Sequence, residues 1–306
     1  MSLSRIARCL LPPLAALALM LVTAVSADAQ APDPNPGNVT IIGNVDFTSA
    51  YMFRGIRRDD TRVIIQPYFD LGLALYSGDG GLKSVGFNIG TWNSLHTGDT
   101  GYNSDITGFG CACGKIWFES DFYATLGLGF GGGTALSGTY TAYNSPNSGF
   151  GTLKEFSAKL AVDDSALLGK AALKPYALVA FEFDTAPGDG QADGGLNAGR
   201  YLEIGIAPGW SGANASITIP MKVGLSLQDY YEINEGTALR PNYVDNRFGF
   251  LSGAAIVTIP LGGTSSFGSW NVHGGVEVQA LGDTTLSFNG GDAQKVIGTV
   301  GFGFTY

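Results

Sequence analysis

Two histidines carry the side chains best suited to acid–base chemistry in this sequence. His96 lies in the stretch NSLHTGD, beside Ser94 and Asp99, and His273 lies in WNVHGGVEVQ, shortly before Glu277. A hydrolase needs a nucleophile within hydrogen-bond reach of such a base. The first stretch permits that arrangement but shows no recognisable catalytic spacing. We therefore expect no catalytic site, and we keep a hydrolase at the rim of the fold as a minor alternative.

Metal and cofactor sites are not expected either. Cys111 and Cys113, in GFGCACGK, supply two thiols, whereas structural zinc takes four ligands. They are more simply a local disulfide or a loop feature. The glycine run GLGFGGGTALSG lacks the Lys-Ser/Thr ending of a phosphate-binding loop, so it predicts a turn between strands.

The remaining charged residues recur at alternate positions of apolar stretches, which places them on one face of β-strands. The main candidates for this face are Asp46, Arg54, Arg62, Asp70, Glu119, Asp121, Glu182, Asp184, Glu203, His273 and Glu277. The same parity adds Lys115, Glu155, Lys159, Asp163, Lys174 and Lys222. Acids outnumber Lys and Arg here, so a water-filled lumen lined by this face would favour cations. Single charges would equally serve as braces, with Arg54 and Arg62 pairing with Glu119 or Asp121.

Twelve segments show the period of two that is typical of strands. They are residues 39–54, 62–76, 82–93, 115–130, 134–143, 152–163, 172–184, 199–209, 216–230, 246–260, 269–281 and 294–306. In the clearest, SITIPMKVGLSLQDY, Met221 and Leu225 face one way and Lys222 the other. In NVTIIGNVDFTSAYMF the same alternation puts Tyr51 and Phe53 on the apolar face.

The connections between these segments alternate in length, at about 13 residues for the odd-numbered ones and about 6 for the even-numbered ones. An even strand count with alternating long and short loops is typical of a transmembrane β-barrel with both ends in the periplasm. A secreted soluble β-sandwich or solenoid is the alternative, but strands of soluble proteins are usually about five or six residues long. We therefore predict an all-β fold, a closed antiparallel transmembrane barrel of about 12 strands, with ten or fourteen as alternatives.

The chain divides into three predicted parts. Residues 1–29 have the basic start, apolar run and small-x-small cleavage site of a signal peptide, and residues 30–38 form a Pro-rich periplasmic leader. The barrel follows over residues 39–306. Its last strand, KVIGTVGFGFTY, ends on the aromatic Tyr306, as expected of a strand that the barrel insertion machinery recognises. These features predict the outer membrane, with its lipid as a partner.

Composition agrees with a barrel. Charged residues make up only 14% of the chain, glycine contributes 46 residues and the mean hydropathy is +0.15. An apolar outer face combined with a polar interior gives such an average. Without the signal peptide the net charge is about −10, so nucleic acid is not expected as a partner.

The first hairpin also resembles a known family. The stretch VDFTSAYMFRGIRRDDTRVIIQPYFDLGLALY, followed by WFESDFYATLGLGF, is similar to the TorF-type porin family, whose members open with T-S-x-Y-x-F-R-G, a short polar loop and a second strand. The residues that carry the likeness are Thr48, Ser49, Tyr51, Phe53, Arg54, Gly55, Trp117, Glu119 and Asp121. It is specific over residues 45–76 and looser over 115–130, and the long connection HTGDTGYNSDITGFGCACG departs from the family. The resemblance implies an outer-membrane channel without naming a solute.

These observations together predict a passive porin for small hydrophilic solutes with mild cation preference. A barrel that does not conduct, with a structural or adhesive role, is the main alternative. A narrow barrel of this size leaves both an open and a plugged lumen possible.

Overall fold

The computed structural model describes residues 37–101, 116–183, 192–193, 195, 197–237, 239–262 and 268–306. The predicted signal peptide, most of the predicted leader, the Cys111 and Cys113 pair, Lys115 and Asp184 lie outside these residues. No helix among the described residues is both long and apolar enough to cross a membrane.

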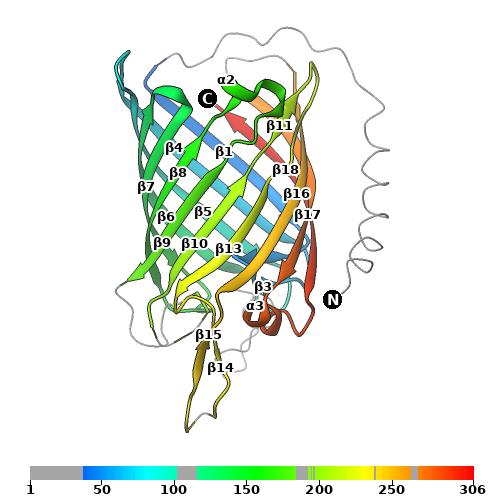
Figure 1. Ribbon diagram of the computed structural model, residues 1–306. Coiled ribbons are helices and arrows are strands. Elements are labelled where there is room, and N and C mark those ends of the chain that lie inside the picture. The colour runs from blue at the N-terminus through cyan, green and yellow to red at the C-terminus, as the bar shows by residue number, and fades with distance from the viewer. Residues whose placement is uncertain are drawn as a thin grey trace.

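Strands make up most of the described chain (Figure 1). They are β1 Val39–Thr48, β2 Tyr51–Phe53, β3 Ile56–Asp59, β4 Ile64–Ser77, β5 Leu82–His96, β6 Trp117–Phe130, β7 Thr134–Asn144, β8 Leu153–Val162, β9 Tyr176–Phe183, β10 Arg200–Ile206, β11 Gly209–Ser211, β12 Ser216–Thr218, β13 Met221–Gln228, β14 Glu232–Asn234, β15 Tyr243–Asp245, β16 Phe248–Pro260, β17 Ser269–Leu281 and β18 Gln294–Thr305. The short helices are α2 Ser165–Leu168 and α3 Asp283–Phe288, and the 3-10 turns are η2 Gly131–Gly133 and η3 Gly169–Ala171.

The main sheet closes on itself. Each strand pairs antiparallel with its neighbours, and β18 completes the ring by pairing with both β17 and β1. Tyr306 extends this last seam, because its backbone N–H donates to the Ile41 carbonyl at 2.8 Å and its carbonyl accepts from the Ile41 N–H at 2.7 Å. We call each continuous strand of the barrel wall a stave, and we count β10 with β11 as one stave and β12 with β13 as another. The described residues then form twelve staves. The predicted closed antiparallel barrel is confirmed.

Two of the staves are interrupted at prolines that lie side by side. The break between β10 and β11 contains Pro208, and the break between β12 and β13 contains Pro220. Proline has no backbone N–H to give to the ladder. The carbonyls still take part, since Pro208 accepts from the Ile219 N–H and Pro220 accepts from the Ala254 N–H, both at 2.9 Å. The wall therefore stays continuous across both breaks.

The two faces of the wall differ as the period of two predicts. On β18, Val296, Val300 and Phe302 are each about half exposed on the outside, as expected of side chains that meet lipid. The alternate positions Gly301 and Gly303 face inward, where they lie against polar side chains of the neighbouring strands. An apolar outside and a polar inside are thus built from the same strand.

The barrel has two unlike ends (Figure 1). The terminal end carries the start of β1, the end of β18 and the connections 78–81, 131–133, 163–175, 212–215 and 261–268. The loop end carries the connections 49–63, 97–116, 145–152, 184–199, 229–247 and 282–293. The predicted alternation of loop lengths is confirmed, with one exception: connection 163–175 holds α2 and η3 and is longer than connection 145–152 of the loop end.

One predicted strand is wrong in its second half. The wall strand expected over 39–54 ends at Thr48, and β2 pairs only with β3 in a separate two-stranded sheet. Tyr51, predicted on the lipid face, is 8% exposed and belongs to a core cluster inside the barrel. The bend at Ser49, where the Thr48 hydroxyl donates to the Ala50 carbonyl at 3.0 Å, turns the chain inward.

Candidate functional site

The hairpin formed by β2 and β3, residues 51–59, is called the L1 hairpin here. Its two-residue turn is Arg54-Gly55, with φ of 49° and 81°, the positive values that a type I′ turn requires. A Cβ on Gly55 would lie 2.9 Å from the ring of Phe250. The turn therefore sits directly against β16, which is separated from β1 by β17 and β18 in the ring, and only glycine fits there.

Arg54, at the tip, is the central contact of the hairpin with the wall. Its guanidinium donates to both carboxylate oxygens of Glu155 on β8, at 2.6 and 2.8 Å, and to the Tyr230 hydroxyl at 2.9 Å. It also lies over the ring of Tyr201, 4.2 Å from the centroid. The side chains of Arg54 and Glu155 are 13% and 3% exposed. A bidentate pair this well buried fixes both the distance and the direction of the tip.

A packed layer surrounds this contact and fills the loop end of the lumen. Its residues come from the hairpin, from the wall and from the connections above it. They are Ile56, Leu153, Ala180, Ala192, Tyr201, Tyr230, Tyr231, Phe250 and Leu281, with Tyr51, Ile64 and Phe118 in a second cluster. Because the layer includes residues of β4, β6, β8, β9, β10, β16 and β17, it extends across the loop end of the lumen.

Carboxylates line the wall beneath the hairpin. Glu119 and Asp121 on β6 are 3% and 6% exposed, and each keeps one oxygen, Oε2 and Oδ1, without a hydrogen-bond partner. Glu182 on β9 accepts from the backbone N–H groups of Ala192 and Gly199, at 2.9 and 2.8 Å. Buried carboxylates without full pairing are costly, so this part of the wall carries more acceptor capacity than its neighbours satisfy.

Arg58 is the second basic residue of the hairpin that faces this wall. It lines a small internal cavity together with Glu119 and Phe150, and its guanidinium donates to the Ala192 carbonyl at 2.7 Å. The predicted brace between Arg54 and Glu119 or Asp121 is not the one observed, because Arg54 pairs with Glu155 instead.

A buried network at the base of the hairpin has the order of a serine-hydrolase triad. The Ser94 hydroxyl lies 2.9 Å from His96 Nε2, and His96 Nδ1 lies 3.4 Å from Asp59 Oδ2. Thr100 connects His96 and Asp59 by hydrogen bonds to both. Burial alone would raise the pKa of Asp59, but hydrogen bonds from His96, Thr100 and Thr61 hold it well below its ordinary value.

Access argues against catalysis by this network. Ser94 and His96 are both 0% exposed, and His96 stacks on the Phe118 ring with centroids 4.2 Å apart. Asp59 belongs to the L1 hairpin itself. Any movement that exposes Ser94 by removing the hairpin would also remove the acid of the triad, so the network is best interpreted as a structural link between hairpin and wall.

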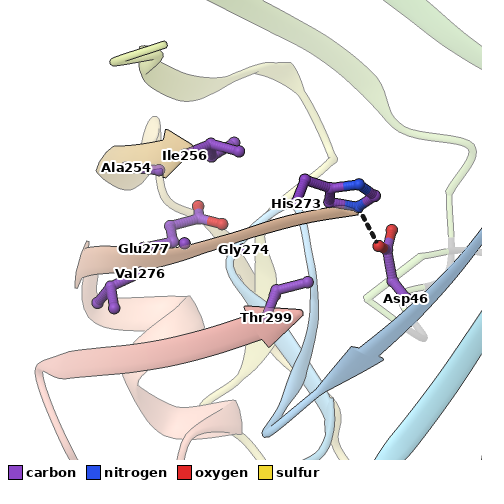
Figure 2. Close-up of a pocket in the computed structure, with 9 residues that line it drawn as sticks. Asp46, Ala254, Ile256, His273, Gly274, Val276, Glu277 and Thr299 are labelled. Carbon is purple, nitrogen blue, oxygen red and sulfur yellow. Dashed lines mark hydrogen bonds and ion pairs between the residues drawn. The ribbon is translucent and has the colours of Figure 1, made fainter. Parts of the chain in front are cut away.

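The terminal end of the lumen contains an open cavity of about 240 Å³. Figure 2 shows the ring of His273 on β17 directed at Asp46 on β1, with Glu277 farther along β17 and Ile256 on β16. His273 Nε2 lies 2.7 Å from Asp46 Oδ1, and its Nδ1 lies 3.1 Å from the amide oxygen of Asn271. Among the described residues, no Lys or Arg lines this cavity.

Glycine on the central strand makes room for this bridge. His273, Gly301 and Asp46 lie in one register row across β17, β18 and β1. A Cβ on Gly301 would overlap Asp46 Oδ1 and would lie 2.5 Å from His273 Nε2. The alternation of glycine and phenylalanine at the end of β18 thus suits both faces of the wall. Phe302 lies on the outer face, and Gly301 on the inner face leaves room for the contact between His273 and Asp46.

Other predicted residues of the polar face pair within the wall. Asp70 accepts from the Asn88 amide and the Tyr123 hydroxyl, at 2.7 and 2.9 Å. Glu203 accepts from the Tyr176 and Tyr201 hydroxyls. Its carboxylate lies 3.8 Å from the Lys222 ammonium.

The structure brings seven of the eleven main candidates together in two groups, while Asp70 and Glu203 pair elsewhere in the wall. Glu119, Asp121 and Glu182, with Arg54, belong to the plugged loop end, and Asp46, His273 and Glu277 to the cavity. Arg62 is exposed on the connection before β4, and Asp184 lies outside the described residues.

Sequence reasoning missed the tyrosines that enclose Arg54. The predicted strand over 216–230 gives Tyr230 the parity of Lys222, but β13 ends at Gln228, and both Tyr230 and Tyr231 lie in the connection that follows it. The paired aromatics in QDYYEI were the available signal, since adjacent tyrosines in a polar loop need a packing partner. Among the described residues, no group of three or more His, Cys, Asp or Glu side chains is placed to hold a metal ion.

A family model described as "Bacterial protein of unknown function (Gcw_chp)" matches residues 31–163, less than half of the chain. This segment includes residues 45–76, over which the TorF-type resemblance is specific; that resemblance stays a prediction. No curated protein matches the sequence.

Solved barrels of several kinds are similar to this chain. An outer membrane channel from Pseudomonas putida F1 is 12% identical with a TM-score of 0.45, covering 92% of this chain and 100% of that chain. The translocator domain of the autotransporter NalP from Neisseria meningitidis is 12% identical, with a TM-score of 0.42 and coverage of 88% and 89%. Outer membrane phospholipase A from Escherichia coli is 11% identical, with a TM-score of 0.41 and coverage of 87% and 92%.

Proposed function

We propose that this protein is an outer-membrane channel for small hydrophilic solutes, closed in the state described by its L1 hairpin. One observation carries the proposal: the twelve-stave wall closes through the β1–β18 pairing without any contribution from β2 or β3. The hairpin is a separate two-stranded sheet. It can leave the lumen without breaking the ladder of the wall.

The charge of the opened lumen supports cation preference. Departure of the hairpin removes Arg54, Arg57 and Arg58 from the loop end. It uncovers wall carboxylates, namely Glu119, Asp121 and Glu155. Asp46 and Glu277 continue the acidic lining at the terminal end. A tube of low-dielectric walls focuses the field of such a lining and concentrates cations.

The outer membrane is the compartment that suits this wall, because its outward residues are apolar and its backbone groups are paired all round. Export by the N-terminal signal peptide and insertion through the strand that ends at Tyr306 are parts of the same proposal. With the loop end facing outward, the cavity at Asp46 and His273 opens toward the periplasm.

Single-channel recording of the refolded mature chain in a planar bilayer with a salt gradient tests the proposal. The variant to compare replaces residues 51–59 by a short Gly/Ser linker. The wild-type chain should be mostly closed, and the variant should conduct steadily with a cation-selective reversal potential. A variant that is folded, as judged by its heat-dependent migration on a gel, but does not conduct would support the non-conducting barrel instead. An anion-selective current would refute the charge argument.

The rim hydrolase remains a second candidate, since the Ser94–His96–Asp59 geometry favours it. We propose that the protein is not an enzyme, because the network is buried and loses its acid when uncovered. Hydrolysis of a phospholipid or ester by the wild-type chain that disappears in His96→Ala would overturn this.

A further inference from the structure

Arg54 is bound by the lumen in the way that proteins bind a guanidinium ligand. Glu155 offers a carboxylate fork at 2.6 and 2.8 Å, the Tyr230 hydroxyl accepts at 2.9 Å, and the Tyr201 ring lies 4.2 Å below the guanidinium carbon. A planar cation between a fork of two oxygens and an aromatic face is the arrangement that distinguishes guanidinium from compact ions. All three of these groups lie outside the hairpin and remain when it leaves.

Two further observations point to a ligand rather than to a simple brace. Arg54 adopts φ of 49° at a turn position where Gly, Asn or Asp is the favoured residue type. An arginine at this position is therefore accounted for by the contacts of its side chain and not by the conformation of its backbone. Nearby on the same lumen wall, Glu119 and Asp121 are more than nine-tenths buried and still have an unpartnered oxygen each. These two side chains thus keep polar oxygens that the arginines of the hairpin do not use.

We propose that the position filled by the Arg54 guanidinium is a recognition site for solutes that carry a guanidinium group, for which Arg54 acts as a tethered substitute. This inference rests on the proposed channel function and names its solute class. A guanidinium solute that takes the place of the Arg54 side chain has Glu155, Tyr201 and Tyr230 as its ligands. By competing with Arg54 for Glu155, it releases the tip of the hairpin and favours the open state.

Binding of guanidinium chloride to purified, refolded Arg54→Ala in detergent tests the site by calorimetry, independently of conductance. The variant should bind guanidinium saturably at millimolar concentration, and the wild-type chain should not. Urea, a neutral molecule of the same planar shape, and sodium ion should bind at least about tenfold more weakly, the loss expected for one charge-assisted hydrogen bond. Adding Glu155→Gln to the variant should weaken guanidinium binding by at least the same factor. Arg57→Ala is the matched control, since Arg57 pairs with Asp60 near the rim and its loss leaves Arg54 in place.

The proposal is overturned if folded Arg54→Ala binds no guanidinium, binds urea equally well, or keeps its affinity when Glu155 is also changed. If Arg54→Ala does not fold, amide hydrogen exchange of residues 51–59 in the wild-type chain replaces the binding measurement. Guanidinium at low millimolar concentration should then speed exchange of this segment, while urea and sodium chloride should not; equal effects of all three overturn the site. A chain that binds guanidinium but never conducts keeps the site and refutes the channel, and a conducting chain without binding does the reverse.

Discussion

The Arg54–Glu155 pair sets the stability of the seated hairpin, and Glu155→Gln isolates its contribution. Glutamine keeps the size of the side chain and one acceptor oxygen but removes the negative charge and the second acceptor. Arg54 then remains buried, at 13% exposure, with the Tyr230 hydroxyl and the Tyr201 ring as its other partners. The variant therefore leaves a buried cation without its counter-charge, and the hairpin should leave the lumen more often.

The expected magnitude follows from the burial of the pair. Breaking a buried ion pair by removing one partner costs about 3–5 kcal/mol. Because the introduced glutamine would still accept one hydrogen bond and Tyr230 still accepts another, we take the lower limit, about 3 kcal/mol. At 1.4 kcal/mol per factor of ten, the ratio of open to closed hairpin should rise about 100-fold.

Native-state amide hydrogen exchange in detergent measures this ratio directly, since exchange of a protected segment reports its local opening free energy. Exchange of residues 51–59 in Glu155→Gln should be about 100-fold faster than in the wild-type chain, and the open probability in bilayers should rise with it. Glu182→Gln is the matched control. Glu182 is the register partner of Glu155 on β9 and is also buried, but it accepts from the backbone of Ala192 and Gly199 and not from the hairpin. A change below about fivefold, or one that Glu182→Gln reproduces in residues 51–59, would refute the assignment of hairpin stability to this pair.

Three other predictions concern the cavity, a loop carboxyl and the buried triad. Gly301→Ala should lower the free energy of unfolding by about 1–3 kcal/mol, because its Cβ would overlap Asp46 Oδ1. Gly298→Ala, whose Cβ would meet nothing within 4 Å, should change it by less than about 0.5 kcal/mol; urea titrations of both refolded variants test the difference. Burial, only partly offset by backbone hydrogen bonds, raises the pKa of the Asp193 carboxyl to about 6 in the folded protein. The contribution of Asp193 to the free energy of unfolding is therefore complete below its ordinary pKa of about 4, and it is lost as the pH rises through about 6. Asp193→Asn should abolish this dependence in denaturant titrations between those pH values, and a persisting slope would assign it elsewhere. Ser94→Ala should leave any hydrolysis of a short-chain nitrophenyl ester unchanged, and loss of a measurable wild-type rate would favour the rim hydrolase.

The wall was predictable because it depends on local pattern. Residues 269–281 were predicted as a strand and form β17 with the same bounds, and residues 82–93 form most of β5. Each such strand has one face in lipid and one in a polar lumen, so its side chains alternate with a period of two. Register and closure follow once the apolar face is known, because a one-residue slip would place the charges in lipid.

The L1 hairpin was not predictable by the same reasoning. Tyr51 and Phe53 continue the alternation of β1, and an apolar side chain is suited both to lipid and to a packed layer inside the lumen. The pattern therefore extended the first strand where the chain in fact turns inward at Ser49. The pairing of Arg54 with Glu155 spans 101 residues, and no local signal selects Glu155 over the other acids of the lumen face.

Because the L1 hairpin is separate from the wall, moving the hairpin requires less free energy than moving a strand of the wall. Moving a wall strand would break ladder hydrogen bonds with two neighbours in a membrane, where each unsatisfied backbone group costs several kcal/mol. Moving the L1 hairpin leaves all those bonds in place and exchanges side-chain contacts for water. The cost is then concentrated in the Arg54 contacts, the packed tyrosines and the Asp59 network. Under the proposed channel function, a dissolved guanidinium that replaces this electrostatic tip contact would couple opening of the lumen to the presence of the solute.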